Sequence, residues 1–284
     1  MTQTEKVNIV DTLERYIAQK GSQNKVAAEM QGVSAATLSQ MRNHNWENIA
    51  DEMWRKVSAH LGIGTNEWKF APTTPSTELT HLFSEAQNLA LVMAVTANAG
   101  SGKTETAKQY LANNANVYRL CCNEYWDKKW FLNELLKKMG KEADGMTLPE
   151  MMQKVVLTLK SINNPLIILD EADKLVDNVL LFFITLYNEL EDHAGIVLMA
   201  THFLERRIKR GVAAQRKGYR EIYSRIGLRF IELETTSYQD VRSVCEANGI
   251  TDDKTIQAIS RDCDGDIRRV KRLVIANKRS QNAG

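Results

Sequence analysis

The chain has 284 residues, of which 43% are hydrophobic and 25% are charged, with 15 glycines and only 4 prolines. This composition is typical of a folded soluble protein and excludes collagen-like, low-complexity and largely disordered classes. Lysine and arginine together number 37 against 35 acidic residues, so the formal net charge of +2 does not by itself indicate a polyanionic partner.

We expect a soluble protein of a reducing compartment. The sequence contains no run of about 18 apolar residues that could span a membrane, and charges lie where a secretory signal would have its apolar core. The four cysteines have no C-x-x-C spacing and no paired histidines, which argues against a zinc site or a disulfide framework. The length suits two compact units.

Residues 1–62 are predicted to form an all-α domain. Apolar side chains recur at helical spacing between Val7 and Ile17, which predicts a first helix. Further helices are predicted over residues 24–30, 35–41 and 47–61.

The second and third of these helices, with the turn between them, resemble the helix-turn-helix of phage repressors. Gly32 lies in the turn, and Asn24 and Ser34 are placed to cap the two helices. In this motif Ser34, Thr37 and Gln40 would face the major groove of DNA, where glutamine can read adenine. A helical hairpin used for protein contacts is the alternative.

The remainder is predicted to be a linker, an α/β core and a helical lid. Residues 63–80 contain two of the four prolines and show no period, which is typical of a linker. Helical patterns without strands follow residue 234, so residues 235–284 are expected to form a small lid.

Between them, residues 81–234 alternate short apolar runs with helical patterns. This alternation predicts a five-stranded parallel sheet covered by helices on both faces. Trp126 and Trp130 are interpreted as packing residues, since aromatic residues at helical spacing usually lie in a core. The expected strands are Leu89–Thr96, Val117–Cys122, Leu166–Leu169, Ile196–Ala200 and Leu228–Leu233.

A glycine-rich segment from Ala97 to Thr104 follows the first expected strand and opens a helix. It has the pattern of a phosphate-binding loop, with Ala97 in place of the usual first glycine. Glycines let backbone N–H groups point at phosphate oxygens, Lys103 would reach the β- and γ-phosphates, and the Thr104 hydroxyl would hold Mg²⁺. The candidate nucleotide contacts are Asn98, Ala99, Gly100, Ser101, Gly102, Lys103, Thr104 and Glu105.

An apolar strand then ends in two adjacent carboxylates, Asp170 and Glu171. We expect Asp170 to hold the magnesium shell and Glu171 to polarise the attacking water. Adjacent carboxylates repel each other, and a divalent cation relieves that repulsion. Together with the glycine-rich loop, this pair predicts binding of a nucleoside triphosphate with Mg²⁺.

Basic residues are concentrated between Arg206 and Arg225, where Glu221 is the only acidic residue. Such a local excess can hold a phosphate backbone even in a nearly neutral chain, whereas the alternative is a solvated helix face. The candidates for phosphate contacts with DNA are Arg206, Arg207, Lys209, Arg210, Arg216, Lys217 and Arg220.

The segments NAGSGKTETA, ILDEADKL, GIVLMATH and YSRIGLR resemble those of the AAA+ ATPases, and more narrowly the transposition ATPases typified by the phage Mu B protein. The resemblance implies an ATP- and Mg²⁺-dependent ATPase that is encoded by a bacterium or phage and is cytoplasmic. It also implies copies that assemble on double-stranded DNA as a filament or ring, deliver target DNA to a transposase and stimulate it.

The resemblance further implies roles for three residues. Thr201 matches a sensor that orients the attacking water, with His202 or simple strand-end capping as alternatives. Arg225 matches the arginine finger that a neighbouring subunit inserts against the γ-phosphate, unless it only belongs to the basic run. Arg268 matches a second sensor in the lid, with Arg269 or a solvated helix face as alternatives.

Two other functions share much of this pattern. A helicase loader related to DnaC and IstB would have the same core but would prefer single strands. A sequence-specific regulator would use the ATPase only to control oligomerisation.

Overall fold

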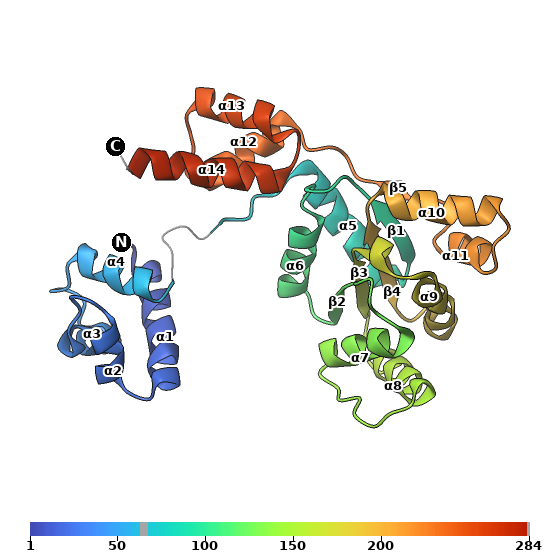
Figure 1. Ribbon diagram of the computed structural model, residues 1–284, viewed down its shortest axis with the longest axis horizontal. Helices are drawn as coiled ribbons and strands as arrows, with labels where there is room; N and C mark the ends of the chain where they lie inside the picture. The colour runs from blue at the N-terminus through green and yellow to red at the C-terminus, as the bar shows by residue number, and fades with distance from the viewer. Residues whose placement is uncertain (63–67, 283–284) are drawn as a thin grey trace. The chain divides into compact units, whose positions relative to one another are not determined.

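The computed structural model describes residues 1–62 and 68–282, and the chain divides into two compact units, Met1–Lys69 and Phe70–Gly284 (Figure 1). The predicted linker begins at residue 63, so its first part, 63–67, lies outside the described residues, as do residues 283–284 of the predicted lid.

The first unit is helical, with a core built from Leu13, Val26, Leu38 and Trp54, all fully buried. Its described helices are α1 (Gln3–Lys20), α2 (Gln23–Glu29), α3 (Ala35–Arg42) and α4 (Asp51–His60).

The caps of α2 and α3 differ from the sequence expectation in one case. Ser22, and not Asn24, caps α2 by accepting a hydrogen bond from the Lys25 N–H, because α2 starts one residue earlier than its pattern predicts. Ser34 caps α3 as predicted. Gly32, in the intervening turn, has a φ of +77°, which an L side chain rarely adopts.

The second unit is built on a five-stranded parallel sheet, which confirms the predicted fold class. Its strand order is β2-β3-β4-β1-β5. The strands are β1 (Val92–Thr96), β2 (Val117–Cys121), β3 (Leu166–Asp170), β4 (Gly195–Ala200) and β5 (Ile231–Glu232).

Two strands begin later than the apolar runs suggest. Residues before Val92 belong to the end of a helix, followed by Ala90 at a φ of +51°. Leu228 has a φ of +59°, which is incompatible with an extended strand, so β5 starts at Ile231.

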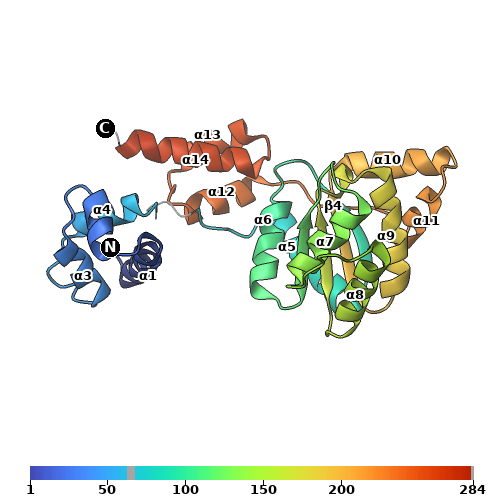
Figure 2. The same ribbon diagram turned by 60° about the horizontal axis from the view of Figure 1, so that its bottom comes forward.

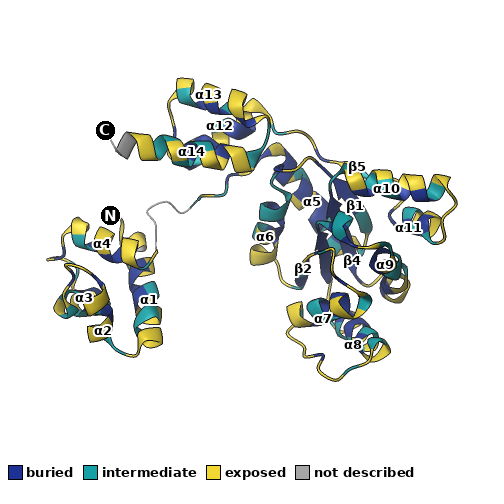
Figure 3. Cartoon of the chain, in the orientation of Figure 1, coloured by how far each residue is buried: buried dark blue, intermediate teal, exposed yellow. Residues whose placement is uncertain are grey.

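Helices cover both faces of this sheet, and α6 and α9 lie on opposite sides of the strands (Figure 2). Buried side chains alternate accordingly: Leu166 and Ile168 of β3 pack with α5 and α6, whereas Ile167 and Leu169 pack with the helices of the other face. Figure 3 shows the resulting buried sheet. One face carries α5 (Thr74–Leu89) and α6 (Lys103–Asn113); the other carries α7 (Lys128–Lys138), α8 (Leu148–Lys160), α9 (Asp177–Leu190), α10 (His202–Ala213) and α11 (Tyr219–Arg225).

The helix α5 begins at Thr74, inside the segment 63–80 that the sequence predicts as a linker. Thr73 and Ser76 form a reciprocal capping box, and Pro75 lies in the first turn, where its missing N–H is tolerated. The Pro-Ser-Thr composition that suggests a loop is therefore a helix start.

Among the described residues, three helices follow the sheet, in the segment 235–284 that the sequence predicts as a lid: α12 (Tyr238–Ala247), α13 (Asp253–Cys263) and α14 (Ile267–Asn282). Asp240 of α12 accepts hydrogen bonds from the Thr74 N–H at 2.7 Å and the Thr74 hydroxyl at 3.0 Å. The Ile267 N–H donates to the Gly100 carbonyl at 2.9 Å, which brings the start of α14 against the glycine-rich loop.

The two tryptophans interpreted as packing residues have different environments. Trp126 is buried, whereas Trp130 is 48% exposed and makes an edge-on contact with the exposed Tyr125 ring. Trp130 lies in the first turn of α7, on the side opposite the buried Phe131 and Leu132, so its interpretation as a packing residue is wrong. Within the described residues, the structure has no helix long and apolar enough to cross a membrane.

Candidate nucleotide-binding site

The glycine-rich loop connects the carboxyl end of β1 to the start of α6. Gly100 and Gly102 have φ values of +82° and +90°, the left-handed region in which L side chains are strained. A side chain at residue 100 would also overlap the Asp266 carboxylate of the lid. Gly102 precedes α6 without providing a side-chain cap, which leaves the first N–H groups of that helix for an anionic ligand.

Lys103 lies within this loop. Its ammonium donates to the carbonyls of Ala97 at 2.8 Å and Asn98 at 3.0 Å, and to the Ser101 hydroxyl at 3.2 Å. Burial lowers the pKa of Lys103 to about 8, although Asp170 and Asp173 favour its charged form. A part-buried ammonium held by three neutral oxygens is a strong anchor for phosphate oxygens, and bound phosphates would favour its charged form.

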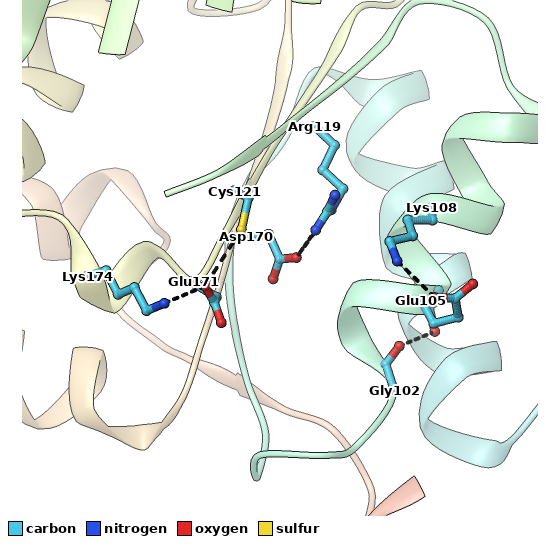
Figure 4. A network of polar contacts seen from close by, with 9 residues as sticks. Gly102, Glu105, Lys108, Arg119, Cys121, Asp170, Glu171 and Lys174 are labelled. Atoms are coloured by element: carbon cyan, nitrogen blue, oxygen red, sulfur yellow. Dashed lines mark hydrogen bonds and ion pairs between the residues drawn. The ribbon is translucent and has the colours of Figure 1, made fainter. Parts of the chain in front are cut away.

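Asp170 ends β3, Glu171 follows it, and the two carboxylates have different surroundings (Figure 4). Asp170 is buried and accepts from Arg119 of β2 at 2.6 Å. Glu171 has a φ of +57° and accepts from the Lys174 ammonium at 2.7 Å and the Cys121 thiol at 3.6 Å. The hydrogen bond from Lys174 lowers the pKa of Glu171, which keeps this carboxylate ionised.

The residues present fit a magnesium–nucleotide complex. Mg²⁺ takes oxygen ligands, and the Thr104 hydroxyl at the start of α6 and the Asp170 carboxylate at the end of β3 are of that kind. The uncapped start of α6 and the Lys103 ammonium supply the donors that phosphates need. Bound Mg²⁺ would neutralise charge that develops on the phosphates.

Two further predicted residues lie at this end of the sheet. Thr201 follows β4, caps α10 and donates its hydroxyl to the Asp173 carboxylate at 2.9 Å. Arg268, in the first turn of α14, is exposed, and its charge contributes to lowering the pKa of both Lys103 and Glu171. The Arg268 guanidinium is therefore within electrostatic reach of the phosphate loop and of the candidate base.

Residues 86–208, which run from α5 through α10, match the family model described as AAA domain. The likeness to this family covers that segment alone.

Two solved structures are similar to part of the chain at low sequence identity. One is Drosophila ORC bound to DNA, with 15% identity and a TM-score of 0.48, covering 75% of this chain and 59% of that chain. The other is NtrX from Brucella abortus in complex with ATP, with 13% identity and a TM-score of 0.46, covering 86% of this chain and 56% of that chain. This chain therefore spans less than two thirds of the length of either one. A comparison with curated proteins finds no match.

Arg225 lies outside the segment that matches the family model, in the same unit. Its guanidinium stacks on the Tyr187 ring at 4.8 Å and lies 3.6 Å from Glu221. It lines a cavity of about 240 Å³ together with Leu89 and Val92, the residue that begins β1. Because the phosphate loop follows the other end of β1, Arg225 is not brought to the nucleotide site of its own chain.

The predicted basic segment divides into two groups. Arg207 and Arg216 both bind Asp177 at the start of α9, and Arg207 also donates to the Leu175 carbonyl at 2.6 Å. Lys209 pairs with Glu205 at 2.6 Å. Among the described residues, no carboxylate pairs with the exposed cations Arg206, Arg210, Lys217 and Arg220.

In the first unit, the predicted DNA-contacting residues lie along α3. The hydroxyls of Ser34 and Thr37 are 2.9 Å apart, and Gln40 is exposed. Gln23 joins the two short helices, donating to the Ala35 carbonyl at 2.7 Å and accepting from Arg42 at 2.8 Å.

Several residues that hold the site in place were missed in the sequence. Lys174 lies three residues after Glu171, a spacing at which side chains meet on one turn. Asp266 lies just before α14 and accepts from the Arg268 N–H, as a helix-capping carboxylate does, so the local sequence could have suggested both residues. Nothing in the sequence near Arg119 or Gln23 indicates their partners, because each partner comes from a different element.

Proposed function

We propose that this chain is an ATP-controlled, largely sequence-nonspecific DNA-binding ATPase. ATP-bound copies assemble on duplex DNA, deliver it to a transposase and activate that enzyme, as the resemblance to transposition ATPases of the Mu B type suggests. ATP hydrolysis then releases the assembly.

The observation that carries this proposal is a set of exposed cations that comes after Thr201 in the sequence: Arg206, Arg210, Lys217 and Arg220. Arg206 and Arg210 lie four residues apart and therefore share one face of α10. Thr201, which caps α10, is bonded to Asp173 near the candidate base Glu171. The state of the nucleotide site can thus act on the helix that presents these charges.

The cations are suited to phosphates and not to bases. Arginine and lysine contacts to the DNA backbone position a protein without reading sequence. They also make affinity fall steeply with salt, because each contact releases counterions.

The position of Arg225 supports a site shared between copies. It lies away from the phosphate loop of its own chain, in a part-buried position beside Tyr187. An arginine so placed can act only on the nucleotide of another copy, which couples hydrolysis to assembly.

The first unit supports the DNA proposal more weakly. The short helices α2 and α3 are held together through Gln23, and α3 presents Gln40 to solvent. Such a helix can enter a major groove, so this unit adds affinity or some sequence preference.

The test is ATP hydrolysis with and without nonspecific duplex DNA, combined with electron microscopy of the same samples in ATP and in ADP. We expect DNA to stimulate hydrolysis and ATP, but not ADP, to support assemblies on duplex. Absence of both effects would contradict the proposal. A clear preference for single strands would favour a helicase loader, and a footprint on one unique site would favour a regulator.

A further inference from the structure

The buried carboxylate of Asp170 has a cationic partner that the ATPase chemistry described above does not use. Arg119 of β2 donates to Asp170 Oδ2 through Nη2 at 2.6 Å and through Nε at 3.2 Å (Figure 4). The Asp170 side chain is 2% exposed and that of Arg119 is 17% exposed. A part-buried, charge-assisted pair of this kind is among the stronger polar contacts in a protein.

The sheet register explains why these two residues meet. In the pairing of β2 with β3, Cys121 lies opposite Asp170 and Arg119 lies opposite Ile168. Because side chains alternate along a strand, Arg119 and Asp170 both point to the face that α6 covers. The long arginine side chain then runs towards the carboxyl edge, where Asp170 lies beside the start of α6.

This edge is also where Asp170 and the Thr104 hydroxyl would hold Mg²⁺. An arginine side chain cannot lose its charge at accessible pH, so the guanidinium remains cationic beside the metal position. Two cations that share one carboxylate oxygen in a part-buried site repel each other strongly.

We propose that Arg119 is a resident cation that competes with Mg²⁺ for Asp170 and thereby sets the Mg²⁺ concentration at which nucleotide binds. Mg²⁺ that binds with the nucleotide would take the Asp170 carboxylate from the guanidinium. Arg119 acts through Asp170, so it is a positioning residue and not a catalytic one. The inference depends on the ATPase site alone and not on DNA binding.

The test measures binding of a fluorescent ATP analogue to the full chain while Mg²⁺ is titrated. Arg119→Met removes the charge and keeps a long apolar side chain, so the half-saturating Mg²⁺ concentration should fall by about tenfold, the effect of one charge-assisted hydrogen bond. An unchanged or higher Mg²⁺ requirement would overturn the proposal, since it would mean that Arg119 and the metal do not compete.

Lys108→Met is the matched control. Lys108 is another cation near the site, on α6, but it pairs with Glu105 at 3.2 Å and not with Asp170. Its removal should leave the Mg²⁺ requirement unchanged. A shift equal to that of Arg119→Met would show a general charge effect and would also overturn the proposal.

A second measurement separates competition from a fold defect. Without nucleotide, Arg119→Met should lower the Tm, because Asp170 is left without its partner, and added Mg²⁺ should raise the Tm of the variant more than that of the parent protein. If Arg119→Met does not fold, Arg119→Lys keeps the charge without the bidentate geometry and should lower the Mg²⁺ requirement by a smaller factor. No change in the lysine variant would then count against the proposal.

Discussion

The phosphate loop and the basic segment between Arg206 and Arg225 are both rich in charged and polar residues, yet they relate to the sequence differently. In the phosphate loop, residues that are neighbours in the sequence form one site: the glycines give the backbone its conformation, and Lys103 donates to the Ala97 carbonyl of the same loop. In the basic segment, adjacent residues separate: Arg206 is exposed, whereas Arg207 binds Asp177 and the Leu175 carbonyl. Residues in a run of like charges therefore have different environments once α10 packs against α11 and α11 packs against α9.

The largest expected effect concerns the last residue of the basic segment. Arg225→Ala should reduce DNA-stimulated ATP hydrolysis by about 10³-fold or more, because an arginine finger stabilises charge on the transferred phosphoryl group. Lys103→Ala should abolish hydrolysis for a different reason, removal of the phosphate anchor. Steady-state phosphate release measures both.

Mixing these two variants tests whether the regions act across copies. Each protein lacks one half of the shared site, so a mixture should recover part of the activity. If the mixture stays as inactive as its components, Arg225 does not act on a neighbouring copy.

The next largest effect concerns DNA binding by α10, where Arg206 and Arg210 are exposed and Arg207 is bound to Asp177. Arg206→Ala with Arg210→Ala should weaken binding to nonspecific duplex and reduce the slope of log affinity against log salt by about 0.9 for each DNA phosphate that the protein no longer neutralises. Arg207→Met should leave that slope unchanged, because its guanidinium is already bound to Asp177. Fluorescence anisotropy over a salt series measures the slopes. Equal slopes for the double variant and for Arg207→Met would contradict the assignment of Arg206 and Arg210, but not Arg207, to DNA phosphates.

A substitution at Asp177 tests whether Arg207 and Arg216 stabilise the fold. It accepts from Arg207, from Arg216 at 2.6 Å and from the Tyr219 hydroxyl at 2.6 Å. Because the Asp177 side chain is 37% exposed, Asp177→Asn should lower the free energy of unfolding by only about 1–2 kcal/mol. Glu205→Gln, which breaks the exposed pair with Lys209, should change it by less than about 0.5 kcal/mol. Urea denaturation compares the two, and equal effects would contradict the assigned roles.

The smallest effect is the pH dependence of nucleotide affinity. Lys103 has a pKa of about 8, and bound phosphates raise it, so binding takes up a proton above pH 8. Affinity should be flat below pH 8 and fall above it, by at most about tenfold per pH unit. Lys103→Arg, which stays charged, should bind without this fall in affinity; calorimetry from pH 7 to 9.5 measures both, and a flat profile in the parent protein would contradict the lowered pKa.

Much of the fold follows from local pattern. The alternation of apolar runs and helical patterns predicts the parallel sheet, because a strand buried on both faces is apolar throughout. The ends of helices and strands are predicted less accurately than their existence. The start of α5 at Thr74 depends on a capping box within a segment whose composition resembles a loop. The start of β5 depends on the left-handed conformation of Leu228, which the apolar run around it does not indicate.

The nucleotide-site prediction needs no tertiary structure, because the phosphate loop and the adjacent carboxylates Asp170 and Glu171 are short, contiguous patterns in the sequence. Which charges remain available depends on the packing: Arg119 is bound to Asp170, Arg207 is bound to Asp177, and Arg225 lies at the far end of β1. The physical reason is that an ion pair depends on which elements pack side by side, and strand order and helix packing bring together residues that are distant in the chain.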